Sequence, residues 1–195
     1  DSDSGDGAGI LCSIPWNYLE KEVNPKNKKD YDKGLGMIFM PNKKEKIEKC
    51  KSICDQEAEK LKVNKTSWRT VPVNNEILGP LAKANAPFIC QWILYIDKND
   101  HKDTERLLFQ LRKRIEKKIR ETFKNHVGDC EFYFASLSSQ TVVYKGMVRS
   151  EILSEFYQDL KEESFKVSFS VYHRRFSTNT LPKWPLAQPM RFLGH

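Results

Sequence analysis

The sequence has no apolar run long enough to cross a membrane as a helix. Its most apolar segment, FICQWILYI at residues 88–96, is far shorter than the roughly 20 residues that a membrane-spanning helix needs, and its pattern predicts a buried strand. The first ten residues, DSDSGDGAGI, are acidic and small, whereas a signal peptide opens with basic and then apolar residues. We therefore expect no membrane partner and an intracellular location, in the cytoplasm or in an organelle.

Cysteine is scarce, and its spacing excludes the common metal motifs. No C-x-x-C pair occurs among the five cysteines, which are Cys12, Cys50, Cys54, Cys90 and Cys130. Cys50 and Cys54 are four residues apart and share one face of a predicted helix, but no matching His or Cys pair accompanies them. We predict reduced thiols and no metal site in this chain.

Glycine and histidine are too scattered to form a familiar catalytic motif. The stretch SGDGAGI has Ile10 where a dinucleotide-binding G-x-G-x-x-G motif needs glycine, and no Lys-Ser/Thr pair follows, as it would in a phosphate-binding loop. Its glycines instead predict a tight turn or a close backbone approach. Spacing alone identifies no Ser/His/Asp set, and the four histidines lie far apart at His101, His126, His173 and His195.

The sequence does contain positive charge and enough apolar residues for a core. Its formal net charge is +7, and hydrophobic residues make up 39% of the chain, which excludes a disordered protein. Residues 102–124 hold nine basic and four acidic side chains, and their apolar residues recur at helical spacing: Leu108, Leu111, Ile115, Ile119 and Phe123. This pattern predicts an amphipathic helix with a charged outer face. No aromatic residues are seen to interleave with the basic ones, which argues against the alternative of a nucleic-acid-binding module.

Short strands and helices alternate irregularly along the chain, which predicts a layered α+β domain. GAGILCSIP at residues 7–15 has the pattern of a loop that enters a buried strand. Further predicted strands cover residues 35–41, 66–73, 88–96 and 165–173, and EFYFASLSSQTVVYKGMV at residues 131–148 has the pattern of a hairpin around a serine-rich turn. The longer predicted helices cover residues 42–63, with Asn42 as N-cap, residues 102–124, and residues 150–160, with Ser150 as N-cap.

Two adjacent arginines follow the predicted buried strand FKVSFSVYH. Arg174 and Arg175 open the stretch RRFSTNT. An arginine is costly to bury unless it meets an anion, so either this is a solvated strand end or one arginine is aimed at a carboxylate or a phosphate. RRFS also matches a basic-directed phosphorylation pattern, but the neighbouring strand pattern argues against the exposed and mobile segment that such a site needs.

Five stretches of the chain together resemble one family. SGDGAGIL, LGMIFMP, WRTVPVNNEILGPLAKANAPFICQ, FYFASLSSQTVVYKGM and HRRFSTNTLPKWPLAQPMRFLGH occur in the order found in the amino-terminal glutaminase domain of glutamate synthases, which are class II glutamine amidotransferases. The last stretch is the most specific, and family members have Ser where this chain has Arg174. The resemblance covers nearly the whole chain.

This resemblance implies an N-terminal-nucleophile fold, a four-layer αββα sandwich that is incomplete here at both ends. It implies L-glutamine as substrate, a Cys at the mature amino terminus as nucleophile, and the α-amino group of that Cys as base. Ammonia would pass to synthase domains of the same chain that hold FMN and an iron–sulfur cluster. The whole enzyme could also use FAD, NAD(P)H and a small subunit.

By the same resemblance, the family's carboxylate-binding arginine falls on Arg175. Its planar guanidinium would grip the α-carboxylate of glutamine through two parallel hydrogen bonds. Phe176, Ser177 and Thr178 would continue the loop that closes over the substrate. Arg174 has no expected contact with glutamine, because alternation along a strand would turn it to the opposite face.

The resemblance also implies what these 195 residues do not contain. The catalytic Cys is expected before Asp1, and the Asn-Gly pair of the oxyanion hole is expected directly after His195. Cys12 lies inside a predicted strand and has no free α-amine, so it cannot replace the nucleophile. We therefore expect residues 1–195 to be a partial domain that carries the carboxylate clamp and has essentially no activity alone. A non-catalytic scaffold that resembles an amidotransferase and binds partners is a further alternative.

Overall fold

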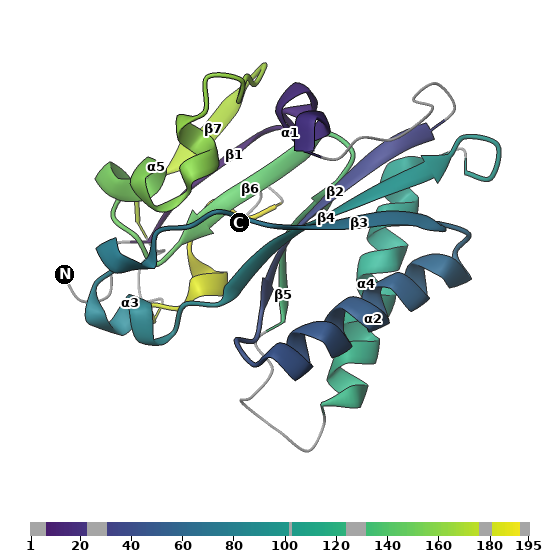
Figure 1. Cartoon of the computed structure of the whole chain (residues 1–195), viewed down its shortest axis with the longest axis horizontal. Helices are drawn as coiled ribbons and strands as arrows, with labels where there is room; N and C mark the ends of the chain where they lie inside the picture. Colours follow the sequence, from purple (N-terminus) through teal and green to yellow (C-terminus); the bar gives the residue numbers. More distant parts are fainter. Residues whose placement is uncertain (1–6, 23–30, 102, 124–131, 176–180, 192–195) are drawn as a thin grey trace. The chain divides into compact units, whose positions relative to one another are not determined.

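The computed structural model describes residues 7–22, 31–101, 103–123, 132–175 and 181–191 of the chain. Helices and antiparallel strands are mixed along it, which confirms the predicted α+β class. The chain divides into two compact units, each built around its own antiparallel sheet (Figure 1). The first unit comprises Asp1–Asn24, Val71–Ala86 and Thr141–His195, and the second comprises Pro25–Thr70 and Pro87–Gln140.

The sheet of the second unit has four strands. From one edge to the other they are β3 (Lys65–Thr70), β4 (Phe88–Asp97), β2 (Tyr31–Met40) and β5 (Tyr133–Ser138). β2 and β4 pair along their full lengths, and most of β4 is buried on both faces, which confirms the buried strand predicted at residues 88–96. β2 begins earlier than predicted, because its polar residues 31–34 pair with the last residues of β4.

Two long helices of this unit, α2 (Lys44–Lys60) and α4 (Thr104–Thr122), lie side by side (Figure 1). One apolar cluster joins both helices to alternate residues of β4, which are Cys90, Trp92, Leu94 and Ile96. The predicted stripe of α4 is buried at Leu108, Leu111, Ile115 and Ile119. The helices therefore cover one face of the sheet with the apolar residues that the sequence pattern identifies.

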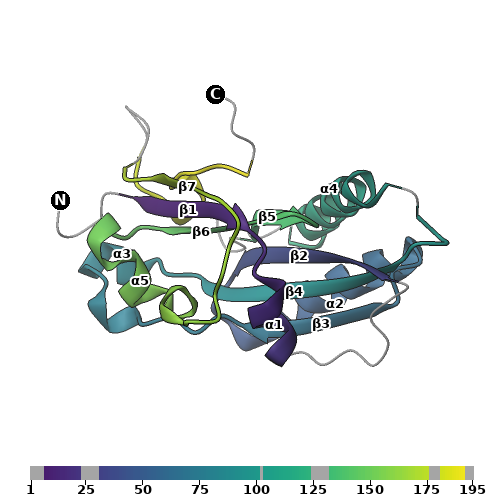
Figure 2. The ribbon, with the colours of Figure 1, turned by 90° about the horizontal axis from the view of Figure 1, so that it is seen from above.

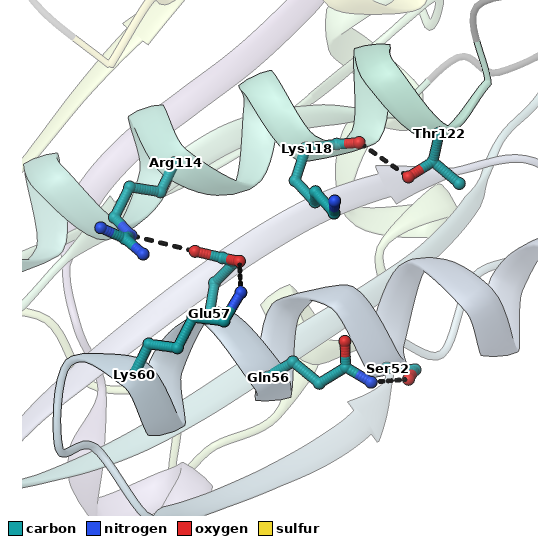
Figure 3. A network of polar contacts seen from close by, with 7 residues as sticks. All are labelled: Ser52, Gln56, Glu57, Lys60, Arg114, Lys118 and Thr122. Carbon is teal, nitrogen blue, oxygen red and sulfur yellow. Dashed lines mark hydrogen bonds and ion pairs between the residues drawn. The ribbon is translucent and has the colours of Figure 1, made fainter.

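A buried carboxylate links the two helices (Figure 3). Glu57 of α2 accepts a hydrogen bond from Arg114 of α4, with 2.9 Å between Oε2 and Nε, and another from Lys60. Burial acts to raise the pKa of the Glu57 carboxyl, but the hydrogen bonds from Lys60 and Arg114 outweigh it and hold that pKa below its usual value. Arg114, half-exposed in the basic helix, thus has a structural partner.

The sheet of the first unit has three strands, with β1 (Ala8–Ser13) between β6 (Thr141–Gly146) and β7 (Ser170–His173) (Figure 2). Its remaining elements are short: α1 (Trp16–Glu22), η1 (Asn75–Ile77), α3 (Pro80–Ala84), η2 (Ser150–Ile152), α5 (Leu153–Phe156), η3 (Gln158–Lys161) and η4 (Trp184–Leu186). Among them, buried Asp159 accepts hydrogen bonds from the hydroxyls of Tyr18 and Tyr144 at 2.9 and 3.0 Å. A buried carboxylate is stabilised by such partners.

The predicted hairpin at residues 131–148 is wrong. β5 pairs with β2 in one sheet, whereas β6 pairs with β1 in the other. Ser138, the last residue of β5, and Ser139, which follows it, bind the carboxylate of Glu105 in α4. Glu105 Oε1 accepts from the backbone N–H of Ser139 at 2.6 Å and from the hydroxyls of Ser138 and Ser139 at 2.9 and 2.7 Å.

Both predicted N-caps are also wrong. The N-cap position of α2 is Lys43 rather than Asn42, and no side-chain hydrogen bond caps that helix. Ser150 is the first residue of η2 rather than its cap, and its hydroxyl donates to the neighbouring Glu151. Within the part of the chain that the structure describes, no helix is both long and apolar enough to cross a membrane.

Candidate functional site

One end of the three-stranded sheet brings together the start of β1 and the ends of β6 and β7. Gly9 of β1 lies opposite Lys145 of β6 on one side and opposite His173 of β7 on the other. β7 ends at His173, so the two arginines follow directly at this end of the sheet. We call it the arginine end, defined by Gly9, Lys145, His173 and Arg175, and it is the candidate functional site.

The two arginines of this site have different surroundings. Arg175 is exposed, and its backbone N–H donates to Nδ1 of His173 at 3.3 Å. Arg174 is also exposed, and its Nη2 lies 3.5 Å from Oε1 of Glu151. An ion pair between exposed side chains contributes about 0–1 kcal/mol. Both arginines lie beyond the end of β7, so strand alternation does not decide their directions, and their assignment to opposite faces stays a prediction.

The other three predicted substrate-binding residues, Phe176, Ser177 and Thr178, lie outside the residues that the structure describes. Their roles stay predictions.

The strand that leads to Arg175 is not buried, which corrects the prediction for residues 165–173. Only residues 170–173 are a strand, and its first three residues are exposed, with Val171 39% and Tyr172 72% accessible. In the described part of the chain β7 pairs with one strand, β1, and is an edge of the sheet. The sequence left two interpretations of the arginine pair, a solvated strand end or an arginine aimed at an anion. Within the described residues, Arg174 and Arg175 lie at a strand end exposed to solvent.

The glycine-rich stretch that enters β1 makes the predicted close backbone approach. Gly7 has a φ of 70°, which L-residues with a side chain rarely adopt. Gly9 allows a close backbone approach, because a Cβ there would lie 2.6 Å from the carbonyl oxygen of Gln188 and 2.6 Å from Cβ of Lys145. The backbone at Gln188 therefore packs directly against the arginine end of the sheet.

Lys145 is a site residue that sequence reasoning missed. Its side chain is fully buried, and its Nζ donates to the carbonyl oxygen of Pro185 at 2.8 Å and lies 3.6 Å from Sδ of Met190. Burial first, and then the positive charge of Arg191, lower the pKa of Lys145 to about 7. The available signal was a lysine inside the apolar strand TVVYKG, where a residue on this face must be buried.

The described cysteines are not suited to nucleophilic catalysis. Cys12, Cys50, Cys54 and Cys90 are buried thiols that form no disulfide. Burial raises the pKa of the Cys12 thiol to about 12, and it likewise raises the pKa of Cys90 to about 12, so both stay protonated at neutral pH. Cys130 lies outside the described residues. Among the described residues, no group of three or more His, Cys, Asp or Glu could hold a metal ion.

The basic helix α4 is partly neutralised by its own surroundings. Arg112 is buried and pairs with Glu116 at 2.9 Å, and Arg114 pairs with Glu57. The prediction that no aromatic residue interleaves with the basic ones is wrong at Phe109. This residue is 48% accessible, and the Arg112 guanidinium carbon lies 5.2 Å from its ring centroid. A single ring with a cation beside it does not form the series of stacking platforms that single-stranded nucleic acid needs.

Comparison with known proteins identifies the family. The whole chain, residues 1–195, matches the family described as glutamine amidotransferases class-II. The chain therefore belongs to the class II glutamine amidotransferases, whose N-terminal-nucleophile hydrolase class fits the mixed α and β elements and the two antiparallel sheets. The resemblance stated from the sequence motifs is confirmed, and the nucleic-acid-binding alternative is not supported.

The most similar relatives include several glutamate synthases. The chain is 45% identical to ferredoxin-dependent glutamate synthase 1, chloroplastic/mitochondrial, of Arabidopsis thaliana. It is 46% identical to ferredoxin-dependent glutamate synthase of Pyropia yezoensis and 45% identical to ferredoxin-dependent glutamate synthase 2 of Synechocystis sp.. Each alignment covers 100% of this chain but only 12% or 13% of the relative, so the chain spans about an eighth of the length of these relatives.

Proposed function

We propose that the chain is part of the glutamine-hydrolysing domain of a glutamate synthase. The substrate is L-glutamine, and the product ammonia is transferred to 2-oxoglutarate to form glutamate in other domains of the same protein. The observation that carries this proposal is the class II match over residues 1–195 together with the 45% identity to glutamate synthases over the whole chain. The position of Arg175 at the end of the sheet where β1 begins supports it.

The proposed reaction uses a cysteine thiol that precedes Asp1 in the full protein. Its sulfur attacks the side-chain amide carbon of glutamine, while the α-amino group of the same cysteine takes the thiol proton and passes it to the leaving nitrogen. Ammonia leaves and a thioester remains. Water then attacks the thioester, which releases glutamate and restores the thiol.

In this proposal, Arg175 binds the α-carboxylate of glutamine, and the loop of Phe176, Ser177 and Thr178 closes over the substrate. An exposed guanidinium at a strand end is accessible to a ligand, and two parallel N–H groups match the two carboxylate oxygens. The buried and protonated Cys12 takes no part in the chemistry.

The proposal extends to the architecture and the surroundings of the domain. The two sheets would belong to a four-layer αββα sandwich, of which residues 1–195 are a part. FMN and an iron–sulfur cluster would be held by other parts of the longer protein, with ferredoxin as electron donor, because the relatives are named as ferredoxin-dependent. The Arabidopsis relative is named as chloroplastic and mitochondrial, which favours an organelle as the compartment.

The test uses the full-length protein with its native amino terminus. Glutamate release from glutamine is measured for the wild type, for Arg175→Lys and for the matched control Arg174→Lys. Loss of a bidentate charge-assisted contact costs about 1.5–3 kcal/mol, so kcat/KM of Arg175→Lys should fall by about 10- to 100-fold. Arg174→Lys should keep wild-type kinetics, because its nearest described partner is Glu151 rather than the substrate.

The outcomes separate the possibilities. Equal kinetics for wild type and Arg175→Lys would show that the carboxylate is bound elsewhere. Absence of glutaminase activity in the wild type, with the protein folded, would instead favour the non-catalytic scaffold.

A further inference from the structure

Lys145 is a buried cation in a place where an apolar residue would fit the strand. Its neighbours in β6, Val142, Val143 and Tyr144, are fully buried, and so is the lysine itself. β6 pairs with β1 through backbone groups, which every residue type except proline supplies in full. Pairing of the sheet therefore does not require a lysine at this position.

The lysine side chain instead reaches a different segment of the chain. Its Nζ donates to the carbonyl oxygen of Pro185 at 2.8 Å and approaches Sδ of Met190 at 3.6 Å. These two contacts hold both ends of a short stretch, residues 185–190, which begins within η4. An amine donates such a hydrogen bond in its neutral form as well as in its charged form.

The stretch held by Lys145 lies directly at the arginine end of the sheet. The carbonyl of Gln188, in the middle of the stretch, approaches Gly9 so closely that a Cβ there would be 2.6 Å away. Gly9 in turn lies opposite His173, two residues before Arg175. A small displacement of residues 185–190 would therefore change the backbone surface beside the proposed glutamine site.

Keeping an amine in this place costs stability. Burial and the nearby Arg191 disfavour its charged form, and an apolar side chain of similar length would avoid that cost. Lys145 therefore lowers the stability of the folded chain at neutral pH, yet it donates to the Pro185 carbonyl. The position that this contact gives residues 185–190 explains the lysine better than a contribution to folding does.

We propose that Lys145 is a positioning residue that anchors residues 185–190 across Gly9 through the carbonyl of Pro185 and thereby shapes the wall of the glutamine site. The expected effect on catalysis rests on the proposed glutaminase function. The anchoring of residues 185–190 does not.

The test compares Lys145→Met with the wild type in the full-length protein. Methionine has a similar length and no donor, and Lys161→Met is the matched control, because Lys161 is an exposed lysine of the same unit. We expect faster hydrogen exchange in residues 181–191 of Lys145→Met, while exchange in the core strands β1 and β6 is unchanged or slower. We also expect kcat for glutamine hydrolysis to fall about tenfold, because a displaced wall no longer holds bound glutamine in its reactive geometry. The effect on KM should be smaller, because Lys145 is not proposed to contact the substrate.

Each outcome decides the inference. Wild-type exchange in residues 181–191 together with wild-type kcat would overturn it. If Lys145→Met does not fold, Lys145→Gln, which keeps a donor on a shorter side chain, is measured instead. Failure of both variants to fold would show that Lys145 is needed for folding, which also overturns a positioning role. If the wild type hydrolyses no glutamine, the proposed function fails, whereas the exchange measurement still tests the anchoring.

Discussion

At the scale of single residues, the basic side chains at the arginine end of the sheet differ in their surroundings, and residue type alone does not predict those surroundings. Arg174 and Arg175 are neighbours and both are exposed, yet one pairs with Glu151 and the other follows His173 without a described carboxylate partner. Lys145 is the opposite case, a cation whose burial lowers its pKa to about 7. The sequence motifs identify the arginines, but only the register of β6 against β1 shows that Lys145 belongs to the same site.

The lowered pKa of Lys145 predicts how stability depends on pH. In the unfolded chain the lysine has its ordinary pKa of 10.5, and in the folded chain its pKa is about 7. As the pH falls from 10.5 to about 7, the unfolded chain binds a proton that the folded chain does not, so this group lowers the free energy of unfolding. Below about pH 7 the folded chain binds the proton too, and the loss stays constant.

Lys145→Met should therefore be more stable than the wild type at neutral pH, and its advantage should shrink as the pH rises towards 10.5. Pulse proteolysis in urea, performed on both proteins across this pH range, measures the difference. His173 and the Tyr157 hydroxyl, which donates to the Lys145 carbonyl, are present in both proteins and cancel to first order. The charge of Arg191 acts on the lysine and is part of the predicted difference. An advantage that is independent of pH would contradict the lowered pKa.

At the scale of elements, two glycines in different strands give opposite predictions for the same substitution. A Cβ at Gly146 of β6 would lie 2.3 Å from a ring carbon of Trp184, which is buried and donates from its indole N–H to the carbonyl of Ala82. At Gly36 of β2 the nearest atoms would be 3.4 Å away or more, which is ordinary contact.

Gly146→Ala should lower the free energy of local opening around β6 by about 1–3 kcal/mol, because the ring must move to make room. Gly36→Ala should be neutral or slightly stabilising, because alanine restricts the unfolded chain. Native-state hydrogen exchange at the amides of β6 and β2 in the full-length protein measures both effects. Equal exchange at β6 in Gly146→Ala and in the wild type would show that Trp184 does not hold this position.

The spacing of apolar residues predicted those elements whose buried face can be read from their own sequence. The apolar stripe of α4 and the buried run of β4 were both identified from the sequence. The pairing of β5 and β6 could not be, because a strand pattern does not name its partner, and the serines expected to form a turn bind Glu105 instead. The prediction of Asn42 as N-cap was wrong because a residue type that favours capping does not fix where the helix begins.

The candidate site was predictable where it rested on motifs and unpredictable where it rested on packing. The stretch beginning at Arg175 and the glycines before β1 were identified from sequence, and the structure places Gly9 and His173 opposite each other. Lys145 and the crossing of Gln188 over Gly9 depend on contacts between segments more than 30 residues apart. No local pattern encodes such contacts, apart from the lysine within an apolar strand.

At the scale of the whole molecule, the chain contains two compact units, each with its own antiparallel sheet, and the candidate site lies in the first. The family match covers both units, residues 1–195, while the relatives extend to about eight times this length. The exposed apolar residues Val171 and Tyr172 beside the arginine end are part of that site's surroundings. Because the relatives are about eight times longer than these 195 residues, glutaminase activity is best measured on the full-length protein.

The measurement that tests the central claim most directly follows the amide nitrogen of glutamine. The full-length protein with its native amino terminus is given amide-labelled glutamine, 2-oxoglutarate and reduced ferredoxin, and the products are analysed for label. The account predicts two molecules of glutamate for each glutamine consumed, with the label in the 2-amino group of the one derived from 2-oxoglutarate. Glutamine left unconsumed by the folded protein would contradict the account.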